Sequence, residues 1–219
     1  MKGHILYKVK PMSANFEINF ILNKFTRYFE LLAYIKETNL EVEISEILCI
    51  DNWLYENQKN ILPEQLNEVE KSLKNGKIVI TYGTVNRDYH AGFYVFLNKW
   101  NKVEICLFID SEIQRGLDED YVTPENQKIY QKIVDWLVEN HQIFDIELCG
   151  IGVETDLQYQ GDIAKCVRES KYMNEWILPE KMKLDMAIEG YERVDVDKCF
   201  VLRRKNEIGV YADESFYTV

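Results

Sequence analysis

Apolar residues alternate with polar ones in parts of the first quarter of the chain and recur at helical spacing in between. Every second residue of 16–22 is apolar, which indicates a strand with one buried face, although the same residues could also lead into a helix. Over 23–36 the large apolar side chains fall on one face of a helix. Residues 3–9 and 40–44 predict two further short strands.

Two more helices are predicted from their start and stop signals. Pro63 can occupy the first turn of a helix, and Asn75–Gly76 is a natural stop for it. Thr123 provides an N-cap directly before Pro124, and apolar residues then line one helix face as far as Asn140.

The middle of the chain contains three β-rich runs, at 77–82, 92–97 and 102–109. Turn-prone segments separate them. Consecutive strands that are joined by such segments form a meander, so we expect an antiparallel meander over about 77–109.

The C-terminal part of the chain combines strand patterns with a helical pattern. We expect 142–153 to return as a strand and 162–190 to be mostly helical, with a break at Pro179. Residues 196–204 and 208–212 predict a closing hairpin.

Strands and helices are partly segregated along the chain, without regular βαβ alternation. This order predicts an α+β fold, mainly an antiparallel sheet with the central meander, the closing C-terminal hairpin and helices packed against it. The 219 residues fit one domain, so we predict a single domain over 1–219, with at most a minor subdivision near 75–76.

Charge limits the partners that the protein can have. The chain carries 37 acidic and 26 basic residues, a formal net charge of −11. Gripping phosphate groups needs concentrated basic surface, so we expect neither nucleic acid nor a membrane as a ligand. With no apolar run near the ~18 residues of a membrane span and no signal peptide visible, we predict a cytoplasmic protein. Acidic surface favours a basic protein partner, although it could equally serve solubility alone.

Local motifs for catalysis, metals or cofactors are missing from the sequence. The five cysteines form no Cys-x-x-Cys pair and mostly sit in apolar runs, where a reduced thiol behaves as a small hydrophobe. His4, His90 and His141 have no ligand spacing. Gly150 and Gly152 lack the third glycine of a dinucleotide site and favour a bend or bulge at the strand end instead. We therefore predict no catalytic residue, no metal and no cofactor.

One acidic segment is the candidate partner-binding site. It concentrates carboxylates beside a tyrosine and only one arginine, Arg115, a mixture that suits a basic protein surface. Alternatively, these charges could interact only with solvent, and the segment could bind no partner. The candidate residues are Asp110, Glu112, Asp118, Glu119, Asp120 and Tyr121.

Aromatic residues make up 13% of the chain, and tyrosine is the most frequent of them. Tyrosine and tryptophan anchor interfaces because they bury large rigid area and keep a polar atom. The alternative is that the rings lie on the protein's own surface with the polar atom outward. Those in polar sequence settings are Trp53, Tyr55, Trp100, Tyr159, Tyr172 and Trp176.

These features favour a non-catalytic protein-binding or inhibitor protein over an enzyme. Bacterial immunity proteins, which neutralise a toxin through acidic and aromatic contacts, are an instance of this class, and the Lys/Asn/Ile/Glu-rich composition fits a bacterial source. One alternative is an enzyme with a non-local site around the 83–106 meander, and another is a subunit of a larger assembly. The residues considered for the enzyme are Arg87, Asp88, His90, Glu104 and Cys106.

Overall fold

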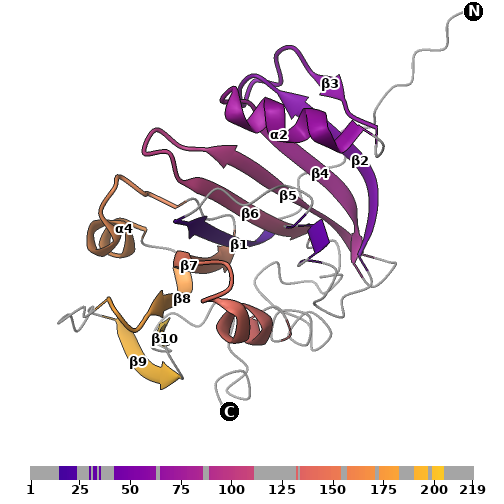
Figure 1. The fold of residues 1–219 in the computed structure, drawn as a ribbon. Helices are drawn as coiled ribbons and strands as arrows, with labels where there is room; N and C mark the ends of the chain where they lie inside the picture. Colours follow the sequence, from indigo (N-terminus) through magenta and orange to yellow (C-terminus); the bar gives the residue numbers. More distant parts are fainter. Residues whose placement is uncertain are drawn as a thin grey trace, which may run out of the picture.

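The described part of the chain is mainly one antiparallel sheet in this computed structural model. The described residues are 15–23, 30, 32–33, 35, 42–62, 65–85, 89–110, 132, 134–153, 157–170, 173–182, 190–196 and 199–204. Their ten strands form one sheet in the order β3-β2-β4-β5-β6-β1-β7-β8-β10-β9 (Figure 1). The strands are β1 (Asn15–Leu22), β2 (Glu43–Ile50), β3 (Lys59–Asn60), β4 (Ile78–Val85), β5 (Tyr89–Leu97), β6 (Val103–Asp110), β7 (Ile146–Val153), β8 (Met173–Pro179), β9 (Tyr191–Val196) and β10 (Cys199–Arg204).

Helices make up a small share of the described residues. They include α2 (Leu66–Lys74), α4 (Ile163–Glu169) and the helical residues 134–140. Helix α2 buries Val69 and Leu73 and ends at Asn75, followed by Gly76 with a φ of 76°. Since glycine adopts this left-handed conformation without strain, the predicted stop at Asn75–Gly76 is confirmed. The α+β prediction therefore holds in coarse form, with strands dominating.

The predicted meander is confirmed, because β4, β5 and β6 pair consecutively and antiparallel. Its first two strands are longer than predicted: β4 continues to Val85 and β5 begins at Tyr89. Gly83 therefore lies inside a strand, where a Cβ would overlap the carbonyl oxygen of Glu43 on β2. The close approach of the two backbones requires a glycine there. In the sequence, such a glycine resembles a turn signal.

Strand β1 resolves the ambiguity of residues 16–22 in favour of a strand. It pairs with β6 on one side and with β7 on the other, so residues far apart in the sequence meet at the centre of the sheet. The register between β7 and β8 shifts after Ile151, but the extra residue lies on β8, so the bend or bulge predicted at the glycines of β7 is not confirmed.

The prediction that 162–190 is mostly helical is wrong for β8. Only α4 is helical among the described residues of this stretch, and β8 is an interior strand between β7 and β10. Trp176, Ile177 and Leu178 are each at most 1% exposed, so consecutive residues are buried on both sides of the strand. A short apolar run of this kind does not show whether its residues follow helical or strand spacing. Pairing with two neighbouring strands made this run a strand.

The C-terminal hairpin exists, but it consists of β9 and β10 over 191–204. Its second strand, β10, corresponds to the predicted run 196–204, whereas β9 was not predicted. The predicted strands 208–212 and 3–9 lie outside the described residues, as does most of the predicted helix 23–36.

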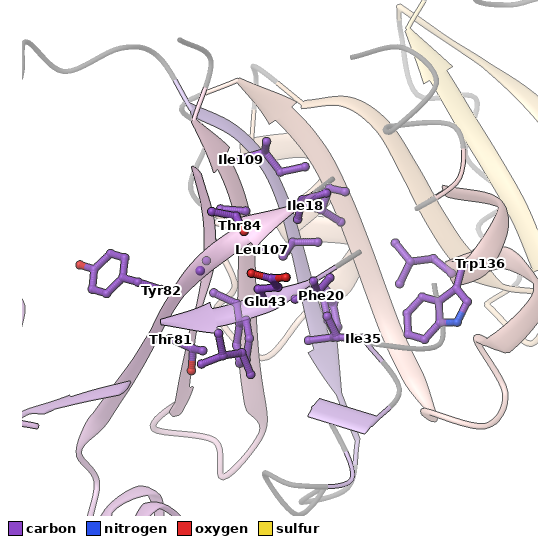
Figure 2. Close-up of a pocket in the computed structure, with 18 residues that line it drawn as sticks. Ile18, Phe20, Ile35, Glu43, Thr81, Tyr82, Thr84, Leu107, Ile109 and Trp136 are labelled. Atoms are coloured by element: carbon purple, nitrogen blue, oxygen red, sulfur yellow. The ribbon is translucent and has the colours of Figure 1, made fainter. Parts of the chain in front are cut away.

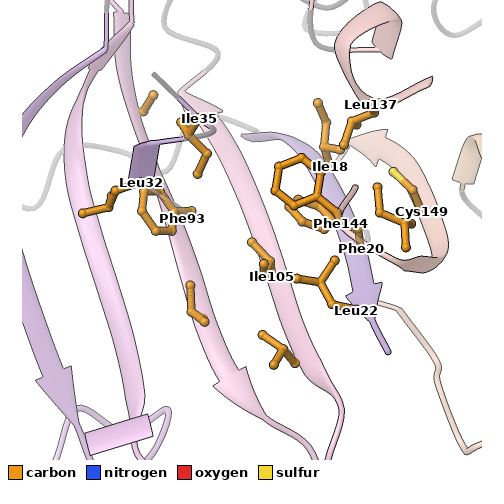
Figure 3. Packing of buried hydrophobic residues seen from close by; sticks show 14 of the residues in the cluster. Ile18, Phe20, Leu22, Leu32, Ile35, Phe93, Ile105, Leu137, Phe144 and Cys149 are labelled. Atoms are coloured by element: carbon orange, nitrogen blue, oxygen red, sulfur yellow. The ribbon is translucent and has the colours of Figure 1, made fainter. Parts of the chain in front are cut away.

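Alternate side chains divide between two faces of the sheet. The covered face carries Ile18, Phe20 and Leu22 of β1, packed in one large apolar cluster with Leu137 of the helical residues 134–140 (Figure 3). Helix α2 adds its buried side chains to the same cluster.

The open face carries Glu17, Asn19 and Ile21 of β1, which alternate with the residues of the covered face. Helix α4 covers one end of it, where Trp176 and Phe200 are buried. A separate apolar cluster from β2 and β4 lies at the other end. The central strands between these two clusters are therefore left without helical cover among the described residues.

Candidate binding groove on the open face of the sheet

The predicted acidic site falls outside the described residues. Asp110 ends β6, but its side chain is not described, and neither are Glu112, Asp118, Glu119, Asp120 and Tyr121. Partner binding by this segment stays a prediction.

A first cavity lies on the covered face, between the sheet and the residues that cover it. Figure 2 shows Ile18, Phe20 and Trp136 around it, with Tyr82 pointing away. The void measures only about 40 Å³, little more than the roughly 30 Å³ that one water molecule occupies in the liquid. Its small volume makes this cavity less suited to a ligand than the cavity described next.

A second cavity, here called the groove, lies on the open face and measures about 510 Å³. It crosses the central strands β5, β6 and β1 and is bounded by Trp53 on one side and by Leu157 and Gln158 on the other. Ligand pockets have volumes of roughly 300–1,000 Å³, so the groove is large enough to bind a molecule or a peptide segment.

Polar side chains of β1 and β6 form the floor of the groove. Asn19 lies opposite Cys106 in the ladder, with Glu17 one rung away on β1 and Glu104 one rung away on β6 in the other direction. Residues i and i+2 of a strand share a face, which is why all four line the same cavity. The two carboxylates thus stand toward opposite ends of the floor, with an amide and a thiol between them.

Aromatic rings form one wall. The Trp53 ring lies edge-on to Tyr94 and to Phe96, with centroid distances of 5.3 and 5.6 Å. Tyr94 also stacks on Phe108 at 4.8 Å, and Phe108 in turn lies where a Cβ of Gly92 would be. Glycine at this position lets the ring lie flat on the sheet, so the wall is a continuous aromatic surface.

Trp53 reaches the wall because the 51–57 loop, which follows β2, folds back across the open face. Its backbone is closed by hydrogen bonds from Asp51 N to Glu56 O (3.1 Å) and from Tyr55 N to Asn52 O (3.0 Å). Side chains brace it further: Asn52 donates to Glu56 and Asn57 donates to Asp51, at 2.7 and 2.6 Å. The loop is therefore held in one shape by its own polar residues.

This loop presents three large apolar side chains in succession. Trp53, Leu54 and Tyr55 are 51%, 79% and 43% exposed. Tyr55 has a φ of 58°, a strained conformation for a residue with a Cβ, and its hydroxyl lies 3.5 Å from that of Tyr82. Strain of this kind persists only when the surroundings enforce it, and it clusters at functional sites.

The opposite wall is fixed by the turn between β5 and β6. Trp100 in this turn packs against Tyr159 at 5.3 Å. It also lies against Gly161, where a Cβ would approach the indole nitrogen to 2.7 Å. These contacts hold the segment that carries Leu157 and Gln158 beside the groove.

Asn98 of the same turn positions Glu104. Its side-chain oxygen accepts the backbone N–H groups of Trp100 and Lys102, and its amide nitrogen donates to Glu104 Oε1 at 2.6 Å. Burial raises the pKa of Glu104 above its ordinary value, and the hydrogen bond from Asn98 opposes this only partly. The carboxyl group is thus oriented, and its charged form is poorly solvated.

Burial also raises the pKa of Tyr94, with smaller contributions from Tyr55, Cys106 and Glu17. The described lining includes two carboxylates and no lysine, arginine or histidine. Such a groove favours a cationic ligand.

The residues considered for an enzyme separate into two groups. Glu104 and Cys106 line the groove, whereas Arg87 and Asp88 lie outside the described residues. His90 is six residues from Phe96 on β5, about 20 Å along the strand, and does not line the groove.

Only some of the aromatic residues in polar sequence settings are exposed in the structure. Trp53 and Tyr55 are exposed, and Trp53 lines the groove, but Tyr159 and Trp176 are 6% and 0% exposed and belong to the core under α4. Glu17 and Asn19 were missed, although their alternation with the apolar residues of 16–22 would have placed them together had this run been assigned as a strand.

Among the described residues, no helix has the length and apolar composition needed to cross a membrane, and no three His, Cys, Asp or Glu side chains are grouped to hold a metal ion. The chain matches no family model, no curated protein and no solved structure.

Proposed function

We propose that this protein is a non-catalytic binding or inhibitor protein that captures a basic protein partner with the 51–57 loop and the groove beside it. One observation carries the proposal: a hydrogen-bonded loop exposes Trp53, Leu54 and Tyr55, and its Trp53 lines a groove whose floor holds carboxylates. Bacterial immunity proteins are the functional class that this combination suits.

Physical arguments support each part of the proposal. Tryptophan and tyrosine are the residues that most often dominate interface energies. A loop that is already ordered loses little conformational freedom on binding, so more of the contact energy appears as affinity. Nearby carboxylates raise the encounter rate with a basic surface and select against acidic ones.

The proposal is tested by capture with matched variants. The tagged wild-type chain, Leu54→Asp and Ile143→Asp are used to capture proteins from the host lysate, with quantification by mass spectrometry. Ile143 is also exposed, at 61%, but lies in the turn 141–145, away from the loop and the groove. We expect one basic protein to be lost at least about tenfold with Leu54→Asp and retained with Ile143→Asp.

Two outcomes would contradict this function. The first is that no captured protein depends on Leu54, and the second is that the dependent protein is acidic. Inhibition is then tested separately by measuring the activity of the captured protein with and without an equimolar amount of the chain. Unchanged activity would show that the chain binds the captured protein without inhibiting it.

A second candidate function, an enzyme, is favoured by one observation: Glu104 lies in a groove, and burial raises its pKa. Perturbed carboxyl groups in clefts are typical of acid–base catalysts. A general acid must hold its proton near the working pH. Measuring the carboxyl titration of Glu104 by ¹³C NMR tests this, and a group that is fully ionised at pH 6 would remove the ground for an enzyme working near neutral pH.

A further inference from the structure

We infer that the edge strand β9 pairs with β9 of a second copy of this chain, antiparallel and edge to edge, in a symmetric dimer. The 51–57 loop follows β2, near the other edge of the sheet, so this contact goes beyond the proposed function. In the inferred register Val194 faces itself across the two-fold axis, and Arg193 of each copy faces Asp195 of the other.

The two edges of the sheet differ in how they are protected against further pairing. At one edge, β3 has only two residues, and the β2–β4 ladder beside it shifts in register between Ile44 and Glu46. At the other edge, β9 has six residues in regular register with β10 and contains no proline (Figure 1). Short strands, bulges and prolines are the usual means of protecting an edge. Among the described residues, no strand pairs with the outer side of β9, which can therefore accept one.

Symmetry restricts how β9 can pair with itself. In a two-fold dimer, residue i contacts residue j of the copy and j contacts i. A two-fold axis perpendicular to the joined sheet leaves every side chain on its own face. Residues that face each other across a ladder share a face, and successive residues of a strand alternate between faces. Facing residues are therefore an even number of positions apart, and one residue lies on the axis and faces itself.

The charges of β9 select one register. An axis at Glu192, Arg193 or Asp195 would place identical charges directly opposite each other, which is destabilising. An axis at either end of the strand would leave most of its residues unpaired with the copy. An axis at Val194 places Arg193 opposite Asp195 twice and uses every rung from 192 to Val196. This self-complementary order favours a second copy as the partner of the strand.

The two central charges are already oriented within one chain. Arg193 Nε lies 2.7 Å from Asp195 Oδ1, and the guanidinium carbon lies 4.1 Å from the ring centroid of Phe200 on β10. Both charged side chains are exposed. In the dimer, two such pairs in opposite orientation form a network of alternating charges. An isolated exposed ion pair contributes little to affinity, but complementary charges across an interface fix its register and reject wrong partners.

The dimer should be weak and should leave the proposed binding loop accessible. Strand addition derives its affinity mainly from main-chain hydrogen bonds, and a single strand pair is smaller than the standard interface of roughly 1,600 Å². We therefore expect reversible dimerisation at micromolar concentrations. Joining at β9 places the two 51–57 loops toward the far ends of one continuous sheet, so the dimer of a protein-binding chain would carry two partner sites.

Sedimentation velocity of the full chain, over about 1 μM to 1 mM, measures the equilibrium. Arg193→Asp leaves two acidic residues at positions 193 and 195, and Asp195→Arg leaves two basic ones. Each single variant should weaken dimerisation at least about tenfold, because like charges then face each other. The double variant Arg193→Asp with Asp195→Arg exchanges the charges, keeps them complementary and should dimerise as the wild type does.

Mixing the two single variants separates pairing from folding. A chain with Arg193→Asp and a chain with Asp195→Arg are complementary in the same register, so together they should form a heterodimer although neither dimerises well alone. A strand that had merely lost its structure would not regain association on mixing. A wild-type chain that stays monomeric over the whole range, or single variants that dimerise as well as the wild type, would overturn the inference.

A cross-link tests the register itself. Facing residues of an antiparallel ladder have Cα atoms about 4.5–5.5 Å apart, a distance that a disulfide can span. Mild oxidation should therefore give a covalent dimer with Val194→Cys but not with Glu192→Cys, which faces Val196 of the copy, nor with the wild type. Equal cross-linking of the two variants would overturn the inference. So would a dimer that is lost with Leu54→Asp and retained with Asp195→Arg, since the contact would then lie at the loop.

Discussion

The covered face and the open face of the same sheet differ in the charged and polar residues that lie among their apolar side chains. On the covered face, one apolar cluster extends from β2 to β10, and two charged residues of its strands, Glu175 and Arg203, pair with each other. On the open face, two apolar clusters are separated by Glu17, Asn19 and Glu104 on central strands.

This difference indicates what each face is for. Carboxylates on the middle strands of a sheet forgo the stabilisation that apolar side chains would provide there. The open face keeps such groups beside a wall of aromatic rings, at the point where helical cover is missing among the described residues. We therefore propose that stability depends chiefly on the covered face and recognition on the open face. The four variants below test this assignment, from the largest expected effect on stability to the smallest.

Arg203→Met should be the most destabilising change. The Nε atom of Arg203 lies 3.0 Å from Glu175 Oε1, and the two side chains are only 14% and 4% exposed. Removing one partner leaves a buried charge without its counterion, which costs about 3–5 kcal/mol of unfolding free energy. Urea unfolding measures the loss.

The double variant Glu175→Leu with Arg203→Met is the control for the same position. Replacing a buried ion pair with apolar side chains of similar size is often neutral, so it should recover most of the lost stability. A single variant as stable as the wild type would show that this pair is not buried in solution.

Gly150→Ala should destabilise the open face under α4. An added Cβ would lie 2.8 Å from Cζ3 of Trp176 and 3.1 Å from Sδ of Met173. Trp176 is completely buried and cannot move aside freely, so overpacking should cost about 1–3 kcal/mol. Thermal unfolding measures the change. Gly76→Ala, in open space at a φ of 76°, is the comparison for backbone strain without overpacking.

Glu104→Gln should stabilise the protein in a pH-dependent way, by less than either change above destabilises it. Because burial raises the pKa of Glu104, the folded state binds the proton more tightly than the unfolded state. Wild-type stability therefore falls as the pH rises from about 4.3, the unfolded pKa, through the folded pKa. Glutamine has no such titration and still accepts the amide of Asn98.

Urea unfolding at pH 4 and pH 7 measures this effect. The free energy of unfolding of Glu104→Gln minus that of the wild type should be larger at pH 7 than at pH 4. An equal difference at both values would show that the charge of Glu104 is well solvated in the groove.

Leu54→Asp should have the smallest effect on stability and a large one on binding. With 79% of Leu54 exposed, the free energy of unfolding should change by no more than about 0.5 kcal/mol. Partner capture should nevertheless be lost, as described above. A clear loss of stability would mean that the exposed loop contributes to folding, and the assignment of the two faces would then fail at this loop.

Much of the fold was predictable where local signals suffice. The helix ending at Asn75–Gly76 and the meander of β4 to β6 depend on residues close in sequence. Strand β8 was not predictable, because its apolar run is short and becomes a strand only between β7 and β10. The exposed aromatics were predictable only as a group, since burial of Tyr159 and Trp176 depends on where α4 packs.

The sequence by itself determined the mainly antiparallel sheet of the chain, its acidic charge and the polar sequence setting of Trp53 and Tyr55. These follow from side-chain period, composition and turn chemistry, which act over a few residues. Only the tertiary structure decided that β1 lies between β6 and β7, and that the 51–57 loop folds back to Tyr94 and Phe96. Pairing of distant strands sets which faces meet, so Glu17 and Glu104, 87 positions apart, form one floor only in the folded sheet.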